Sequence, residues 1–362
     1  MSIHGRVSVV PPTLADVAER AGVSRQTVSN AVNNPELLRA DTLRRVQDAI
    51  EELGYLPNRA ARNLRTRTSH LIGLPIKAVE EGTANASMDR FVHSLVETAS
   101  EHGYHVLLFP HDLAADPQLE PAAQLASYDA LLRSTAVDAF VVTDTYLGNP
   151  HAIWLSDRRA PFVAFGRPWS ERETASESVA PSERPSGHWW VDVDGGAGTQ
   201  LATDHVIDRG HQRVAWIGWR KDTVLGEDRR AGWSRSMRAH GLSTAGLASR
   251  VEDSVNSGRE ASAILLDEAA PTAFVCASDT LAVGVLHTLV ERGLRPGHDI
   301  AVTGFDDSQV AQVVPPGLTS VRQPLEDVAV EVVRALTALL GPISAPPKGV
   351  LLAPSLVVRG SS

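Results

Sequence analysis

From Leu71 onward, short apolar runs alternate with amphipathic stretches of helical spacing, and this alternation limits the fold more than any other feature of the chain. Apolar runs bounded by turn residues are typical of buried strands, and strands joined by crossover helices form parallel sheets covered on both faces. The predicted strands are 71–76, 104–109, 139–143, 161–165, 190–193, 213–218, 272–276 and 300–305, and the main helices are 91–101, 122–133, 199–208, 261–266 and 281–292. The predicted fold class is therefore α/β, with two Rossmann-like lobes.

The series of strands and helices is interrupted once, at residues 170–188, which are rich in Ser, Glu, Pro and Arg. Such a composition buries little apolar surface and predicts a mobile surface loop. We expect the loop to separate two lobes, each with its own parallel sheet. The expected boundaries are residues 71–168 with 324–343 for the first lobe, and residues 189–320 with 348–358 for the second.

Residues 13–57 carry a helical pattern in place of the alternation. Thr13 and Ser24 are suited to cap the first two helices, and Gly54 follows the last apolar residue of a third. Three short helices of this kind predict a compact module. Residues 1–12 show no periodicity and end in two prolines, so we interpret them as a flexible tail.

The outer face of the second helix is polar. With Val28 pointing inward, four side chains project together on the outside. These side chains are Arg25, Gln26, Ser29 and Asn30. Arginine can read guanine, and Gln or Asn can pair with adenine, in the major groove of DNA. Three further residues, placed for phosphate oxygens, are Ser24, Thr27 and Asn33. The alternative is a solvated face of a small helical bundle, because helix-turn-helix shapes also occur in proteins that never touch DNA.

Charge is distributed unevenly along the chain. The net charge of all 362 residues is −9, which by itself argues against nucleic acid as a partner. Up to His70, however, ten arginines stand against seven acidic residues, so this segment carries +3 and the remainder carries −12. The average therefore does not exclude a DNA-binding end.

The composition excludes several classes of protein. Hydrophobic residues make up 43% of the chain, and no apolar run is long enough to span a bilayer, which excludes membrane proteins and wholly disordered chains. The single cysteine, Cys276, excludes an internal disulfide and a multi-cysteine zinc site. The first residues do not have the order of a signal peptide, so a reducing cytoplasm is the expected location.

Enzyme signatures are weak or missing in the sequence. The glycine-rich run from Asp194 to Thr199 lacks the third glycine of a dinucleotide fingerprint and the Gly-Lys-Ser/Thr of a phosphate loop, so it predicts a helix start after a strand. Neither a G-x-S-x-G elbow nor an H-E-x-x-H motif occurs. We therefore expect no catalytic residue, no metal and no cofactor.

One family resemblance covers almost the whole chain. Residues 13–33 read TLADVAERAGVSRQTVSNAVN and closely resemble the headpiece of the lac repressor (LacI/GalR) family of bacterial transcription factors. The likeness continues with GYLPNRAARNL at residues 54–64, which looks like that family's hinge helix, expected here over residues 58–66. It returns in RGHQRVA (209–215), ASD (277–279), GFDD (304–307) and LTSVRQP (318–324).

The resemblance implies roles for the residues of the helical module. Base reading is implied for Arg25, Gln26 and Asn30, and contact with the DNA backbone for Leu14, Ser24, Thr27, Asn33 and Arg59. Leu64 matches the hinge leucine that family members insert into the minor groove, and Ala61 matches the contact residue before it. An apolar side chain on a short helix that bears arginines can unstack a base step and bend the duplex. A linker residue that packs on the following domain is the alternative for Leu64.

The resemblance also implies a two-lobed, periplasmic-binding-protein-like domain with a small effector in the cleft between its lobes. Loops after the strands of open parallel sheets are where ligands bind. Arg229 and Asp306 match the family's effector-binding arginine and aspartate, and such a pair can bracket vicinal hydroxyls. A surface salt bridge or a helix cap is the alternative for each. Further candidate effector-binding residues are Ser278, Gln323, Trp219 and Lys77.

These features together predict a DNA-binding transcriptional regulator, and we expect a repressor. Half-sites on DNA are read by dimers, so a homodimer on a pseudo-palindromic operator of double-stranded DNA is implied, and the lack of a heptad tail after residues 356–360 favours a dimer over a tetramer. The acidic body favours a neutral saccharide as the effector. A soluble sugar-binding module without DNA function is the alternative, and a sugar-processing enzyme is a further one that lacks any paired carboxylates we can place.

Overall fold

A computed structural model describes residues 12–55, 68–76, 86–110, 125–143, 149–169, 187–220, 224–342 and 349–362. The chain divides into two compact units, Met1–Ser69 and His70–Ser362. Three predicted features lie wholly or largely outside the described residues, namely the tail 1–12, the hinge helix 58–66 and the loop 170–188.

The described part of the first unit, residues 12–55, contains three α-helices and one short turn of 3₁₀-helix. They are α1 (Leu14–Ala21), α2 (Arg25–Asn33), η1 (Pro35–Leu37) and α3 (Ala40–Leu53). Thr13 caps α1 reciprocally with Asp16, whose carboxylate accepts a hydrogen bond of 2.7 Å from the Thr13 backbone N–H. The Ser24 hydroxyl accepts from the Thr27 N–H at 3.1 Å. Gly54 ends α3 with φ +62°, a left-handed conformation that suits glycine. The predicted three-helix module is thus confirmed.

A small apolar core holds the first unit together. Val17, Val28 and Val46, one from each helix, are fully buried, and Tyr55 closes the cluster after α3. Each buried valine stabilises the fold by about 1.5–3 kcal/mol relative to exposure. Because Val28 is buried in this core, the opposite, polar face of α2 is turned away from the core.

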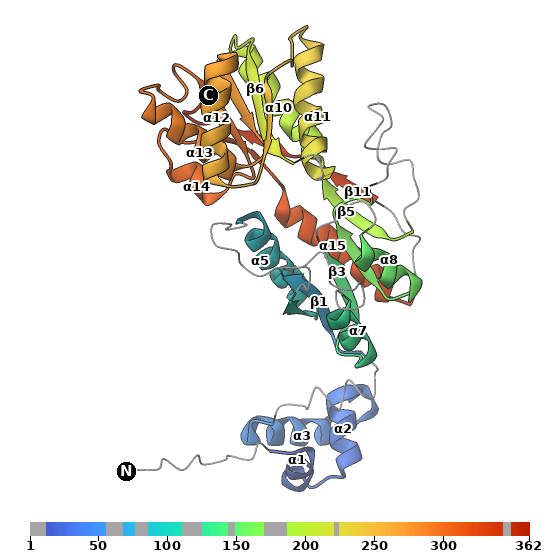
Figure 1. Cartoon of the computed structure of the whole chain (residues 1–362). Coiled ribbons are helices and arrows are strands. Elements are labelled where there is room, and N and C mark those ends of the chain that lie inside the picture. The colour runs from blue at the N-terminus through green and yellow to red at the C-terminus, as the bar shows by residue number, and fades with distance from the viewer. Residues whose placement is uncertain are drawn as a thin grey trace, which may run out of the picture. The chain divides into compact units, whose positions relative to one another are not determined.

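The first sheet of the second unit contains six parallel strands. In spatial order they are β11 (Gly349–Leu352), β5 (Trp189–Val193), β4 (Phe162–Phe165), β3 (Ala139–Val142), β1 (Leu71–Ile76) and β2 (His105–Pro110). Helices α5 (Ala86–Glu101) and α15 (Leu325–Leu340) share one apolar cluster with the sheet, and α7 (Ala126–Arg133) and α8 (Pro150–Asp157) share another. Alternate residues of β3 serve the two clusters, since Phe140 packs with α7 and Val141 with α5. The sheet is therefore covered on both faces, as Figure 1 shows.

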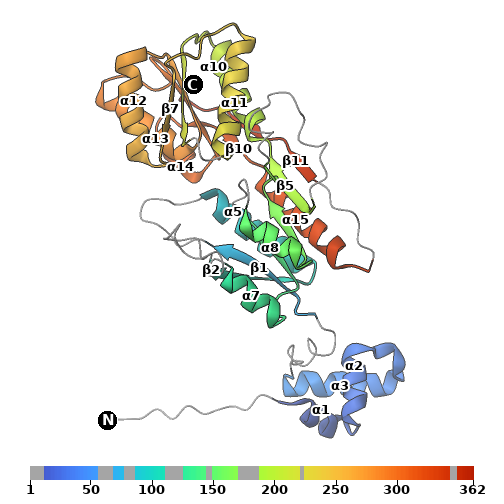
Figure 2. The ribbon, with the colours of Figure 1, turned by 45° about the vertical axis from the view of Figure 1, so that its right-hand side comes forward.

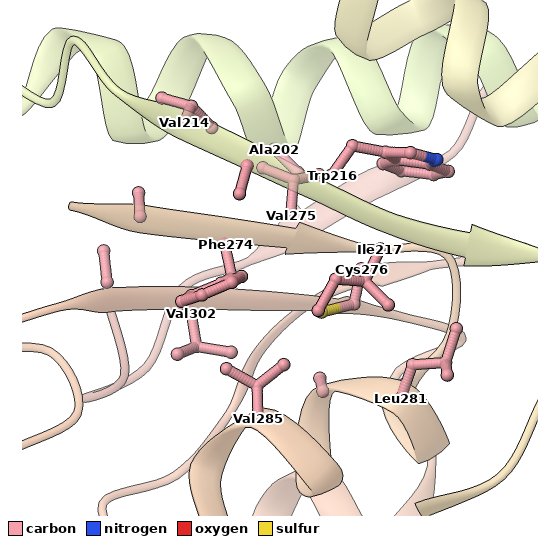
Figure 3. Packing of buried hydrophobic residues seen from close by; sticks show 14 of the residues in the cluster. Ala202, Val214, Trp216, Ile217, Phe274, Val275, Cys276, Leu281, Val285 and Val302 are labelled. Atoms are coloured by element: carbon pink, nitrogen blue, oxygen red, sulfur yellow. The ribbon is translucent and has the colours of Figure 1, made fainter. Parts of the chain in front are cut away.

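The second sheet has the same doubly wound construction. Its order is β12 (Ser355–Val357), β10 (Thr319–Arg322), β9 (Ala301–Phe305), β8 (Ala273–Cys276), β6 (Val214–Trp219) and β7 (Ala248–Val251), with only β12 antiparallel to its neighbour. Figures 1 and 2 show α10 (Gly195–Asp208) and α11 (Val224–Ala239) on one side of this sheet, and α12 (Val255–Ala269) and α13 (Asp279–Glu291) on the other. The short helix α14 (Gln309–Val313) follows β9. Trp216, Phe274 and Val285 are among the residues that fill the core in Figure 3.

Glycines allow the helices of each pair to approach closely. A Cβ at Gly232 on α11 would collide with the carbonyl oxygen of Gly196 on α10. On the other face, a Cβ at Gly258 of α12 would collide with the carbonyl oxygen of Leu281 on α13. The backbones therefore touch at these points, and any side chain would force the helices apart.

The chain crosses between the two sheets three times. The crossovers lie at Asp194 between β5 and α10, at residues 323–324 between β10 and α15, and at residues 353–354 between β11 and β12. Residues 189–193 and 348–358 were predicted to belong to the second lobe. That prediction is wrong for β5 and β11, because β5 pairs with β4 and β11 pairs with β5 in the first sheet. An apolar run shows that a strand is buried, but it does not show which sheet the strand joins.

Candidate functional site

The polar face of α2 is presented to solvent. Arg25 and Gln26 are exposed, and Ser29 and Asn30 are half-buried. The Gln26 side-chain amide donates a hydrogen bond of 3.1 Å to the Asn30 side-chain oxygen, one helical turn away. Both amides therefore lie side by side along the outer surface, where they can meet base edges as an aligned pair.

The residues at the two ends of α2 already have partners within the helix. The Ser24 and Thr27 hydroxyls lie 2.9 Å apart. The Asn33 side-chain amide donates to the Ser29 carbonyl at 2.7 Å, so one of its two N–H groups is taken. Leu14 packs partly against the core of the unit. The other predicted DNA-contact residues, Arg59, Ala61 and Leu64, lie outside the described residues.

A second constellation lies at the carboxyl ends of strands in the second sheet. Arg229 on α11 is 4% exposed, and its Cζ atom lies 3.6 Å from the centroid of the Phe305 ring and 4.7 Å from that of Trp219. Its Nη1 donates to the Ala277 carbonyl at 2.5 Å. The guanidinium is thus held between two aromatic rings by cation–π contacts. Burial lowers the pKa of Arg229, and the nearby Asp306 and other acids oppose that effect.

Asp306 faces Arg229 from the end of β9. Its Oδ1 lies 3.8 Å from Arg229 Nη2 and accepts a hydrogen bond of 2.7 Å from the Gln323 side-chain amide. Asp306 has φ +105°, a left-handed conformation that is uncommon for residues other than glycine. Strained residues of this kind concentrate at functional sites. The structure therefore brings together three of the predicted effector-binding residues, Arg229, Asp306 and Gln323.

Ser278 and Trp219 belong to the same site, where both lie beside Asp253, an acid that was not predicted from the sequence. The Ser278 hydroxyl caps α13 and donates to Asp253 Oδ1 at 2.5 Å. Burial raises the pKa of Asp253, and the Ser278 and Trp219 side chains oppose that rise. Asp253 follows β7, whose residues ASRV contain no apolar run, so the strand that positions this acid gave no signal. Lys77 lies outside the described residues.

Two buried donors of this site lack hydrogen-bond partners among the described residues. They are Arg229 Nε and the indole Nε1 of Trp219. The indole opposes the rise in the pKa of Asp253, but its N–H does not reach hydrogen-bonding geometry. Buried donors are nearly always satisfied, so a ligand that supplies oxygen acceptors fits here. Carboxylates beside them can accept from the same ligand's hydroxyls. Within the described ranges no cluster of His, Cys, Asp or Glu could hold a metal ion, and no helix is long and apolar enough to cross a membrane.

Comparisons with known proteins match both parts of the chain. Residues 13–58 match the family model described as bacterial regulatory proteins, lacI family, and residues 203–362 match the periplasmic binding protein-like domain. The HTH-type transcriptional regulator CelR of Thermobifida fusca is 32% identical over 97% of this chain and 98% of its own length. Among solved structures, a CelR–cellobiose complex is 29% identical with a TM-score of 0.69, over 97% of this chain and 100% of that one. The lac repressor dimer bound to operator and the anti-inducer ONPF is 28% identical with a TM-score of 0.79, over 97% and 99%.

A helix-turn-helix unit joined to a two-sheet ligand-binding unit defines a class of DNA-binding transcriptional regulators. The α/β fold with its two sheets matches the lac repressor fold, as predicted. The chain belongs to the lacI family of bacterial regulatory proteins. The relatives named above are transcription regulators and not enzymes.

Proposed function

We propose that this protein is a repressor that binds a pseudo-palindromic operator as a homodimer and changes its operator affinity when a saccharide occupies the site around Arg229 and Asp306. The observation that carries the proposal is the buried Arg229 guanidinium: its Nη2 lies 3.8 Å from Asp306 Oδ1, and its Nε has no hydrogen-bond partner in the part of the chain that the structure describes. A hydroxyl-rich neutral ligand supplies both the acceptor that Arg229 needs and the donors that the carboxylates need.

The saccharide class rests on chemistry and on a relative. Trp219 is half-buried beside Arg229, and indole rings pack well on the apolar faces of sugars. The CelR structure at 29% identity holds cellobiose. The part of this chain after His70 carries −12, which disfavours a strongly anionic ligand.

Exposed apolar side chains support the dimer. Val313 on α14 is 73% exposed, and Val310, three residues earlier on the same helix, is 38% exposed. Exposed apolar clusters of this kind mark association surfaces. A two-fold dimer would carry two headpieces, one from each chain, and each could bind one of the two half-sites on DNA.

The proposal is tested with the purified full-length chain in two steps. Selection from random duplex DNA should return a pseudo-palindrome, and titration of a saccharide panel that includes cellobiose should raise the melting temperature for one member of the panel. Asp306→Asn keeps an acceptor for Gln323 and tolerates φ +105°, so it should fold while it loses at least about tenfold in affinity for that sugar. Asp208→Asn, an exposed change on α10, is the matched control.

Each outcome bears on one part of the proposal. Recovery of no enriched sequence would leave a sugar-binding module without DNA function as the better description. A chain that binds its selected DNA but responds to no saccharide would refute the effector class alone. Equal sugar affinity in Asp306→Asn and Asp208→Asn would remove Asp306 from the site.

A further inference from the structure

A second buried arginine, Arg167, joins the two lobes directly. It follows β4 in the first lobe, and its side chain is 5% exposed. Its Nε donates a hydrogen bond of 2.6 Å to Asp192 on β5, in the same lobe. Its Nη2 donates at 3.2 Å to Asp228, which lies on α11 in the second lobe. One guanidinium therefore bridges carboxylates from both lobes.

Asp228 is held from both sides. The oxygen that accepts from Arg167 also accepts from the backbone N–H of Gly196 at 2.9 Å, in the first turn of α10. Burial raises the pKa of Asp228 and that of Asp192, and in both cases the positive charge of Arg167 opposes the rise. Removing one partner from a buried ion pair leaves the other charge uncompensated, so these groups act together.

The turn of α11 that carries Asp228 also carries the effector arginine. Arg229 is the next residue, and both side chains flank the crossover from β5 to α10. A Cβ at Gly195 would lie 3.1 Å from Asp228 Oδ2 and 3.2 Å from Arg229 Cγ. A shift of this turn when a ligand engages Arg229 must therefore move Asp228 as well, and with it the contact to the first lobe.

We propose that Asp228 is a positioning residue that ties the first lobe to the effector site: by holding Arg167, it fixes the arrangement of the two lobes from the same helical turn that presents Arg229. The consequence for DNA binding rests on the proposed function. The tie itself is a property of the ligand-free chain, because all of its members are protein groups.

The test compares two neighbouring substitutions on α11. Asp228→Asn preserves size and an oxygen for the Gly196 N–H but removes the charge that holds Arg167. Glu227→Gln is the matched control, since the Glu227 carboxylate accepts from Arg230 and Arg250, both in the second lobe. A fall in melting temperature that is common to both variants reports only the loss of a charge.

Lobe arrangement is measured between spin labels on Glu97→Cys in α5 and Glu268→Cys in α12. The one native cysteine, Cys276, is buried, so labelling is selective, and an excess of unlabelled chain removes distances between protomers. We expect Asp228→Asn to broaden or shift the distance distribution of the ligand-free protein, and Glu227→Gln to leave it unchanged. Arg167→Met should act like Asp228→Asn, and the double variant should add nothing. A distribution in Asp228→Asn that coincides with that of the parent chain overturns the tie.

The link to function is read from operator affinity without effector. Asp228→Asn should change the operator Kd by at least about threefold through the altered population of lobe arrangements, and Glu227→Gln should not. A changed distance distribution with unchanged operator affinity overturns the coupling. A parent chain that binds no operator would refute the proposed function instead, and the distance measurement would still decide whether Asp228 ties the lobes.

Discussion

At the scale of single residues, two buried arginines in the second unit need acidic partners to compensate their charge. Arg167 and Arg229 are each about 4% exposed, each lies over an aromatic ring, and each faces carboxylates. Taking a charge out of water costs several kcal/mol unless it is paired and hydrogen-bonded. Asp192 and Asp228 each accept a hydrogen bond from Arg167, whereas Asp306 lies 3.8 Å from Arg229, beyond hydrogen-bonding distance. This difference is the reason why we propose a structural role for Arg167 and a ligand-binding role for Arg229.

The exposed arginine of α2 leads to a prediction about sequence reading. Arg25→Lys keeps the positive charge but loses the planar fork that pairs with guanine at two points, so discrimination at one base pair should fall by about 1–3 kcal/mol. Arg44→Lys, at an exposed position on α3, is the control. Affinities measured for single-base variants of the selected operator check the result. Equal losses on every sequence would contradict base reading by Arg25.

Asp279 leads to a prediction about pH. It is buried behind Ser278, where it accepts hydrogen bonds from Ser308 and Ser320, and burial together with the nearby Asp306 raises its pKa from 3.8 to about 7. Because the folded chain holds a proton that the unfolded chain releases, this contribution to stability is complete below pH 3.8 and is lost as the pH rises through about 7.

The free energy of unfolding should therefore fall by roughly 2 kcal/mol between pH 5 and pH 7 on account of Asp279. Urea denaturation at pH 5, 6, 7 and 8 should show a smaller fall in Asp279→Asn, which does not titrate. The other buried acids contribute the same pH dependence to both proteins, so the difference between the two pH profiles reports Asp279 alone. Parallel pH profiles for the two proteins would show that Asp279 is ionised throughout this range.

At the scale of elements, local signals predicted the first unit best. The caps Thr13 and Ser24 and the terminating Gly54 act within one helical turn, so the sequence shows them directly. β7 was missed because it is an edge strand whose side chains are largely exposed, and Asp253 was missed with it. The interlobe contact between Arg167 and Asp228 spans 61 positions, and no local pattern encodes it. Residues within a motif were thus predictable from local patterns, and the distant pair Arg229 and Asp306 was predicted from the family resemblance. The pair Arg167 and Asp228, which only the topology brings together, was not predicted.

The close pair α10 and α11 leads to a stability prediction. Gly232→Ala would place a methyl group against the Gly196 carbonyl, and separation of the two helices should destabilise the second unit by about 3 kcal/mol or more. Ala239→Gly exchanges the same two residue types at an exposed position of α11, and it should lower the free energy of unfolding by only about 0.5–1 kcal/mol. Denaturation in urea measures both. A loss for Gly232→Ala no larger than that for Ala239→Gly would mean that the helices can separate freely.

At the scale of the whole molecule, charge and fold divide in the same place. The segment up to His70 carries +3 and the remainder −12, and the chain divides into compact units at Ser69. Such a small positive excess gives weak attraction to phosphates, so the proposed operator binding would depend on two headpieces and base contacts together. The acidic second unit opposes attachment to nonspecific DNA.

The proposed dimer leads to a prediction at this scale. Val313→Glu puts a charge on the exposed apolar surface of α14, and we expect the chain to become a monomer that loses at least about a hundredfold in operator affinity. Multi-angle light scattering and an operator titration measure the two effects. Val290→Glu on α13, where valine is 66% exposed, is the control. A dimeric Val313→Glu would exclude α14 from the interface.

The three crossovers between the sheets also govern the order in which the molecule can be completed during synthesis. The first sheet needs α15 to cover one face and β11 to close its edge, yet these elements are made only after every strand of the second sheet except β12. Until residues 325–340 leave the ribosome, the apolar face that receives Val328 and Val332 lacks its α15 cover. The second lobe can therefore approach its final form first, although it is encoded later, and the nascent first lobe is the part that a chaperone would bind.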